Sequence, residues 1–96
     1  MRAEYDSTAD AIAISLAEAD RASQGDEVHE RAIVAIAGER PIEVQLLYPS
    51  QGTAEPLAAV AKGYALDLEA LEAAARAALA APDRAVEVNV VSPLAS

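Results

Sequence analysis

Asp6, Asp10 and His29 are a set of side chains in this sequence that could together bind a metal ion or transfer protons. Two carboxylates that are four residues apart can share an ion, or divide acid and base roles, if their oxygens converge. His29 is the only histidine, and Glu30 follows it, so a carboxylate could join the imidazole on a metal. These residues define one candidate function, a small metal-dependent or acid–base enzyme.

A structural role for the same residues is the favoured interpretation. Asp6 and Asp10 flank a short polar run, and such side chains hold turns by accepting hydrogen bonds from nearby amides. A zinc site uses three or four protein ligands, which one histidine without cysteines does not readily supply. The sequence also lacks a Gly-x-Ser-x-Gly elbow, a Gly-x-Gly-x-x-Gly turn and a phosphate-binding loop. We therefore predict no catalytic, cofactor-binding or metal-binding residues and no cofactor.

The composition narrows the class of protein. The 96 residues include 16 acidic and 7 basic side chains, for a net charge of −9, and no cysteine. Nucleic-acid binding needs clustered Lys and Arg, and redox or disulfide chemistry needs cysteine. The sequence has no apolar run of about 20 residues and no apolar signal region after its start. We expect a cytoplasmic protein that binds neither nucleic acid nor membranes.

The first half of the chain has the patterns of β-structure. Residues 11–17 alternate between apolar and small or polar side chains, as a half-buried strand does. Residues 32–37 are apolar throughout, which favours a central strand covered on both faces. The polar residues 18–30 are interpreted as a solvated connection. Strands are predicted at 2–5, 11–17, 32–37 and 42–48.

The second half is predicted to be helical and to end in a strand. Residues 55–62 could form a short helix that Gly63 ends, whereas residues 67–81 form a longer amphipathic helix capped by Asp67 and stopped by Pro82. Residues 86–91 alternate again and predict a last strand. The expected fold is one α+β domain over residues 1–96. It has an antiparallel sheet of four or five strands, with one long helix packed on one face. Residues 3–50 would form a β-meander, and residues 51–96 the helical segment and final strand.

One stretch has the character of a family motif. The run Tyr5-Asp6-Ser7-Thr8-Ala9-Asp10-Ala11 resembles the Tyr-Asp-x-x-Ala-Asp-Ala opening of small bacterial proteins grouped as domain of unknown function 2283. The later Ile42-Glu43-Val44-Gln45-Leu46 is similar to the family's Ile-Glu-x-x-Leu segment, so the resemblance covers the N-terminal half, although Ser7 stands where the family often has proline. The resemblance implies a small antiparallel sheet. Some members look like the partner half of two-gene modules that encode a small toxin and its antidote, so the resemblance makes non-enzymatic protein binding the first hypothesis. The acidic charge of this chain would suit a small basic toxin.

A protein-interaction role has its own candidate residues. Tyr5, Tyr48 and Tyr64 are the three aromatic residues of the chain, and tyrosine is enriched at protein interfaces. Leu47 lies on the polar side of its strand and would offer an apolar contact if the helix covers the other side. With no Phe or Trp, the core must use small aliphatic side chains, so we expect a homodimer or a small protein partner. A structural subunit of a larger assembly remains an open alternative.

Overall fold

The computed structural model describes residues 1–18 and 21–88 of the chain. It is an α+β structure in which the paired strands are all antiparallel. A short 3₁₀ turn, Pro49–Gln51, links the strands to the helices. The strands are β1 (Arg2–Asp6), β2 (Ala11–Ser15), β3 (Gln24–His29), β4 (Ala32–Ala37), β5 (Arg40–Leu47) and β6 (Ala85–Glu87), and the helices are α1 (Ala54–Tyr64) and α2 (Leu68–Ala80).

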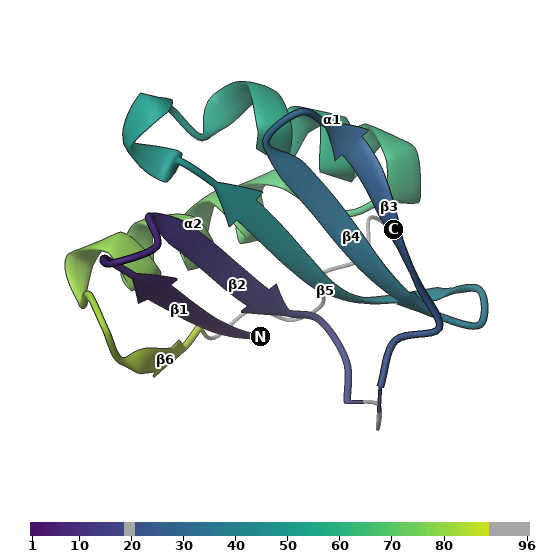
Figure 1. Cartoon of the computed structure of the whole chain (residues 1–96), viewed down its shortest axis with the longest axis horizontal. Coiled ribbons are helices and arrows are strands. Elements are labelled where there is room, and N and C mark those ends of the chain that lie inside the picture. Colours follow the sequence, from purple (N-terminus) through teal and green to yellow (C-terminus); the bar gives the residue numbers. More distant parts are fainter. Residues whose placement is uncertain (19–20, 89–96) are drawn as a thin grey trace.

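The six strands form one sheet in the order β3-β4-β5-β2-β1-β6. Both helices lie on the same side of this sheet, as Figure 1 shows. Helix α1 packs on β3, β4 and β5, whereas α2 packs on β1, β2 and β6. The molecule therefore has two layers, and among the described residues no element covers the second face of the sheet.

The alternation of side chains along the strands sets which face meets the helices. In β2 the buried residues are Ile12 and Ile14, and the residues between them are only half-buried. Strand β1 pairs with β2 so that Ala3 lies opposite Ile14, which places both buried side chains on one face. A shift of one residue would move this apolar set to the other face, so the buried pattern fixes the register.

The β4–β5 hairpin turns through Gly38 and Glu39, between the paired residues Ala37 and Arg40. Gly38 has a φ of 68°, which glycine adopts without the steric cost of a Cβ. The register shifts beyond Ala35, where Ile36 pairs with Pro41. Proline cannot donate to the ladder, and a local irregularity is one of the few places where a sheet accepts it.

The core lies between the sheet and the helices and is built from aliphatic side chains. Leu57 and Val60 of α1 and Leu71 of α2 are fully buried against it. Helix α2 contributes several alanines to the same contact, and small side chains let its backbone approach the sheet closely. The largest fully buried side chains are Ile12, Ile14, Val34, Val44, Leu46, Pro56, Leu57, Val60 and Leu71.

The strand prediction was correct in type but incomplete. The sheet has six strands rather than four or five, because residues 24–29, interpreted as a solvated connection, form edge strand β3. Most of its side chains are exposed, so it shows no apolar alternation. Strand β3 is held to β4 by backbone hydrogen bonds, and a pattern of side chains does not predict such bonds.

The helix prediction also needs correction, because two helices rather than one long helix cover the sheet. Helix α1 has 11 residues and α2 has 13, so neither dominates. Gly63 does not end α1, which continues to Tyr64 and stops where Ala65 adopts a left-handed conformation. An isolated glycine lowers helix stability by only about 1 kcal/mol, and packing on the sheet outweighs this.

Two predictions about the second half are confirmed. Asp67 is the N-cap of α2, and its Oδ1 accepts a hydrogen bond from the backbone N of Glu69 at 3.0 Å. The last strand joins the sheet after the helices and pairs with β1. Its described part is Ala85–Glu87, and residues 89–91 of the predicted strand lie outside the described residues.

Strand β4 differs from the expectation of cover on both faces. It is an inner strand, and Val34 is fully buried under α1, but Ile33 and Ala35 on the opposite face are only half-buried. Small β-branched and alanine side chains thus fill a face that no described helix covers. Within the described residues, no helix has both the length and the apolar composition needed to cross a membrane.

Candidate functional site

Asp10 joins three segments at one end of the sheet. Its Oδ1 accepts a hydrogen bond from the Tyr5 hydroxyl at 3.0 Å, and its Oδ2 accepts one from the Ser50 hydroxyl at 2.6 Å. Its backbone carbonyl accepts from the Tyr48 amide at 2.8 Å. The hydrogen bond to Asp10 is the main cause that raises the pKa of Tyr5, because the carboxylate favours the protonated phenol. Both carboxylate oxygens of Asp10 are therefore occupied within the fold.

Asp6 acts within the turn that it begins. Its Oδ1 accepts hydrogen bonds from the backbone N of Thr8 at 3.0 Å and of Ala9 at 3.2 Å. This is the local pattern by which a short acidic side chain holds a turn. The β1–β2 connection therefore owes its shape to the residues that also form the family-like motif.

Asp83 clamps the same turn from the far end of the sequence. Its two carboxylate oxygens accept from Ser7, one from the backbone N at 2.9 Å and one from Oγ at 2.6 Å. The Asp83 amide in turn donates to the Tyr5 carbonyl at 2.7 Å. The Ser7 side-chain and backbone hydrogen bonds lower the pKa of Asp83 because they stabilise the carboxylate.

His29 belongs to the β3–β4 turn. Its Nδ1 accepts a hydrogen bond from the Arg31 amide at 3.0 Å, so this nitrogen serves the turn. The Arg31 guanidinium donates to the carbonyls of Tyr48 at 3.1 Å and Gly52 at 2.7 Å. Arg31 thereby ties this turn to the segment that follows β5.

The structure does not bring Asp6, Asp10 and His29 together. Asp10 precedes β2 and His29 lies in β3, and the sheet order places three strand spacings, about 14 Å, between these strands. Asp6, in β1, is one strand further away. In the described part of the chain, no group of three or more His, Cys, Asp or Glu side chains is placed to hold a metal ion. These three residues therefore do not form one site in the described structure.

The four residues predicted for an interface do not share one surface. Tyr5 and Tyr64 are half-buried on the helix side, near opposite edges of the sheet. Tyr64 donates a hydrogen bond to Asp26 of β3, and burial together with this bond raises the pKa of Tyr64 to about 12. Tyr48 is 50% exposed in a left-handed conformation after β5. Of the four, Leu47 points to the uncovered face, as its alternation with buried Leu46 predicted.

No family model, curated protein or solved structure matches the chain. The resemblance of the N-terminal half to domain of unknown function 2283 therefore stays a prediction.

Among the described residues, no helix or strand packs on the uncovered face of the sheet. It is formed by the strand residues that alternate with the buried ones. The cross-strand pairs that define it include Glu4 with Ala13 and Ser15 with Glu43. Its acidic members are Glu4, Asp6, Glu27, Glu43 and Glu87, its basic members are Arg2 and Arg40, and its apolar members include Ala11, Ala13, Ile33, Ala35 and Leu47.

A shallow trough runs along β2 on this face. Its floor is Ala11, Ala13 and Ser15, all small, whereas the side chains on the neighbouring strands are larger. Three adjoining hollows mark its course. One of about 300 Å³ lies between Asp6 and Leu47, one of about 260 Å³ lies around Ala13 and Ser15, and one of about 760 Å³ lies at the end of the strands. We call this feature the β2 trough.

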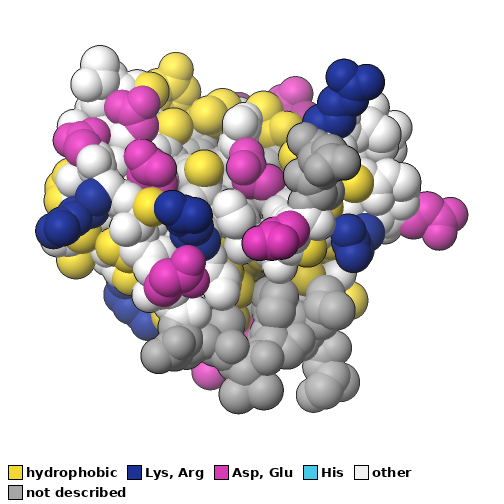
Figure 2. All heavy atoms as spheres, turned by 90° about the horizontal axis from the view of Figure 1, so that it is seen from below, with side chains coloured by type: hydrophobic (Ala, Val, Ile, Leu, Met, Phe, Trp, Pro, Cys, Tyr) yellow, Lys and Arg dark blue, Asp and Glu magenta, His cyan; other side chains and the backbone are white. Residues whose placement is uncertain are grey.

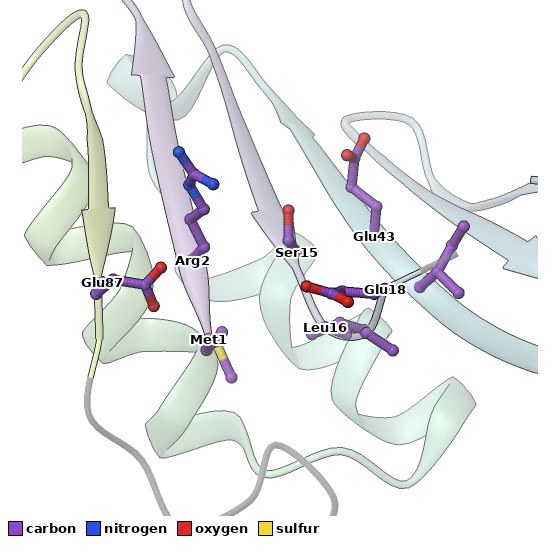
Figure 3. Close-up of a pocket in the computed structure, with 9 residues that line it drawn as sticks. Met1, Arg2, Ser15, Leu16, Glu18, Glu43 and Glu87 are labelled. Atoms are coloured by element: carbon purple, nitrogen blue, oxygen red, sulfur yellow. The ribbon is translucent and has the colours of Figure 1, made fainter. Parts of the chain in front are cut away.

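The largest hollow lies where β6, β1, β2 and β5 meet at one end of the sheet (Figure 3). In that view Arg2, Ser15 and Glu43 project from three neighbouring strands toward the same side. Glu87 lies beside Arg2 from β6, and Glu18 comes from the segment after β2. Apolar Met1, Leu16 and Ile42 also line this hollow.

The surface seen from below shows acidic and basic side chains separated by small hydrophobic areas (Figure 2). On this face the dark blue basic groups stand apart from one another rather than forming a continuous patch. Phosphate backbones bind to clustered cations, and the described residues in this view show no such cluster.

The trough was not predicted as a site, although its signal is present in the sequence. Ala11, Ala13 and Ser15 occupy alternate positions of a strand whose other face carries isoleucines. Sequence alone could not show that β1 and β5 flank this strand with longer side chains, because β2 and β5 are separated by more than 20 residues. The clamp between Ser7 and Asp83 was missed for the same reason.

Proposed function

We propose that this chain is a non-enzymatic protein-interaction module that binds a partner through the uncovered face of its sheet. The observation that carries the proposal is this face itself: a six-stranded antiparallel sheet with both helices on the other side. Ile33 and Leu47 are half-buried there without a described element above them. Apolar side chains on an open face are a common basis for association.

The proposal extends to the class of partner that the resemblance implies. An antidote-like partner of a small basic toxin, acting in the bacterial cytoplasm, would need an acidic binding surface. The net charge of −9 and the five acidic strand residues of the uncovered face support this. Charge complementarity speeds the encounter of two proteins and disfavours like-charged competitors.

A homodimer through the same face is less well supported. A two-fold contact would place the same, mainly acidic surface on both sides of the interface. With five acidic and two basic strand residues on the face, the balance is repulsive at neutral pH. A structural subunit of a larger assembly would use the same surface and differ in stoichiometry.

A photo-crosslinking residue at position 47 tests the proposal in cells that express the chain naturally. Leu47 lies on the uncovered face, whereas Ala58 is exposed on α1 and provides the matched control position. We expect one partner, identified by mass spectrometry, to be crosslinked from position 47 and displaced by excess unlabelled chain. Equal crosslinking from both positions, or none from position 47, would refute the proposal. Light scattering of the purified chain distinguishes a homodimer from a hetero-partner.

A further inference from the structure

We infer that the β2 trough binds an extended, Lys- or Arg-rich segment of the partner, an inference that rests on the proposed function. The trough follows the five residues of β2, which span about 17 Å. That length corresponds to about five residues of an extended peptide. The walls stand on β1 and β5, two strand spacings or about 10 Å apart, so one extended chain fits between them.

The charges of the walls favour a positively charged ligand. Glu4 and Asp6 of β1 lie along one wall, and Glu43 of β5 lies along the other. Glu18 and Glu87 add carboxylates at the wide end. Arg2 of β1 is the basic side chain of the lining, and it stands across Ser15 from Glu43. In an extended segment, cations at alternate positions share one side of the chain. When that side faces the floor of the trough, their long side chains can reach carboxylates on either wall, whereas an acidic segment would be repelled.

The floor favours a close approach of such a segment. Ala11 and Ala13 present methyl groups rather than long side chains, so a bound backbone or a lysine stem can lie against them. Leu47 adds an apolar contact beside Ala11, its partner in the ladder. The aliphatic part of a lysine can pack on this floor while its ammonium group reaches a wall carboxylate.

The uncovered face is better suited to a basic extended segment than to a second copy of the chain. A second copy would bring a face with the same excess of carboxylates, which include Glu4, Asp6 and Glu43. It would also need a protruding basic ridge to enter the trough, and the trough itself is concave. A basic segment satisfies both the shape and the charge.

Fluorescence anisotropy with a synthetic probe tests the inference. The probe is a labelled peptide of about nine residues in which Lys alternates with Thr, and its control has Glu in place of Lys. We expect the lysine peptide to bind and its affinity to fall as salt is raised, since exposed charge pairs are screened. Binding of the glutamate peptide with equal affinity would overturn the inference.

Two matched pairs of variants locate the binding site. Ala13→Leu fills the floor of the trough, whereas Ala35→Leu adds the same side chain to the same face two strands from β2. We expect Ala13→Leu to weaken binding about tenfold or more, and Ala35→Leu to change it less than about threefold. Equal effects of the two would show that the trough is not the site.

The second pair compares two double variants that change the net charge of the chain by the same amount. Glu4→Gln with Glu43→Gln removes two wall carboxylates, while Glu55→Gln with Glu69→Gln removes two exposed carboxylates on the helices. The wall pair should weaken binding at least about fivefold more than the helix pair. Equal losses would mean attraction to net charge alone. If position 47 still crosslinks a partner but the probe does not bind, this inference fails and the proposed function stands.

Discussion

Asp83 accepts two hydrogen bonds from Ser7, a residue 76 positions earlier in the chain. The pair fastens the β1–β2 turn to the segment between α2 and β6. Strands β1 and β6 are the first and last strands of the described chain, and they pair with each other. The clamp lies at one end of this pair. The polar turn of the family-like motif is thus a connection point of the fold.

This clamp predicts an acid-dependent part of the stability. The pKa of Asp83 is lowered from 3.8 in the folded state, so its stabilising effect is complete above that value and is lost as pH falls through the lowered pKa. Asp83→Asn should lower the urea midpoint at about pH 7, and the difference from wild type should shrink at about pH 2.5. Ser7→Ala should show the same pH dependence. A difference that is unchanged by pH would contradict the role of the carboxylate.

Sequence patterns sufficed where side chains alternate between core and solvent. Ile12 and Ile14 placed β2, and the apolar run 32–37 gave β4 with its observed bounds. Asp67 marked the start of α2, because a capping side chain acts on amides within its own turn. These are local effects, and local sequence reports them.

Long-range pairing was the part that sequence could not supply. Strand β3 exists because β4 offers it a backbone ladder, although its own side chains are mostly exposed. Asp6 accepts hydrogen bonds from turn amides, as predicted, whereas the Asp10 carboxylate accepts from the hydroxyls of Tyr5 and Ser50 instead. Ser50, which lies 40 positions from Asp10, could be assigned to that carboxylate only after the fold was known.

The burial of Tyr64, together with its hydrogen bond to Asp26, predicts a loss of stability in alkali. The pKa of Tyr64 is raised from 10.0 to about 12 in the folded state, so its stabilising contribution is complete below about pH 10 and is lost as pH rises toward 12. Tyr64→Phe should flatten the fall of the unfolding midpoint over this range. Tyr48→Phe removes the hydroxyl of a half-exposed tyrosine and is the matched control. An alkaline fall as steep in Tyr64→Phe as in Tyr48→Phe would contradict this role of Tyr64.

The alanines of α2 predict a core that cannot accept larger side chains. Ala74 is fully buried between α2 and the sheet, whereas Ala80 at the end of the same helix is exposed. Ala74→Leu should destabilise the fold by about 1–3 kcal/mol, because the added atoms must displace packed neighbours. Ala80→Leu should change the free energy of unfolding by less than about 0.5 kcal/mol. Urea denaturation measures both, and similar values for the two would show that the helix contact is loose.

Two glycines predict opposite effects of the same substitution. Gly38 turns the β4–β5 hairpin at a φ of 68°, and no heavy atom lies within 4 Å of a Cβ placed there. Gly38→Ala therefore creates no clash with a neighbour, but it forces an L-residue into the left-handed region at a cost of about 1 kcal/mol. Gly63 lies inside α1, where an added Cβ would be 3.8 Å from Val28 Cγ1, an ordinary contact.

Gly63→Ala should accordingly stabilise the chain by about 0.5–1 kcal/mol, because alanine loses less backbone entropy than glycine when a helix forms. Equilibrium urea denaturation of the two variants and wild type measures both changes in the free energy of unfolding. Destabilisation by Gly63→Ala would mean that α1 does not run through this position, and a neutral Gly38→Ala would mean that the hairpin turn has another conformation. The opposite signs follow from backbone conformation alone, since both substitutions add the same methyl group where there is room for it.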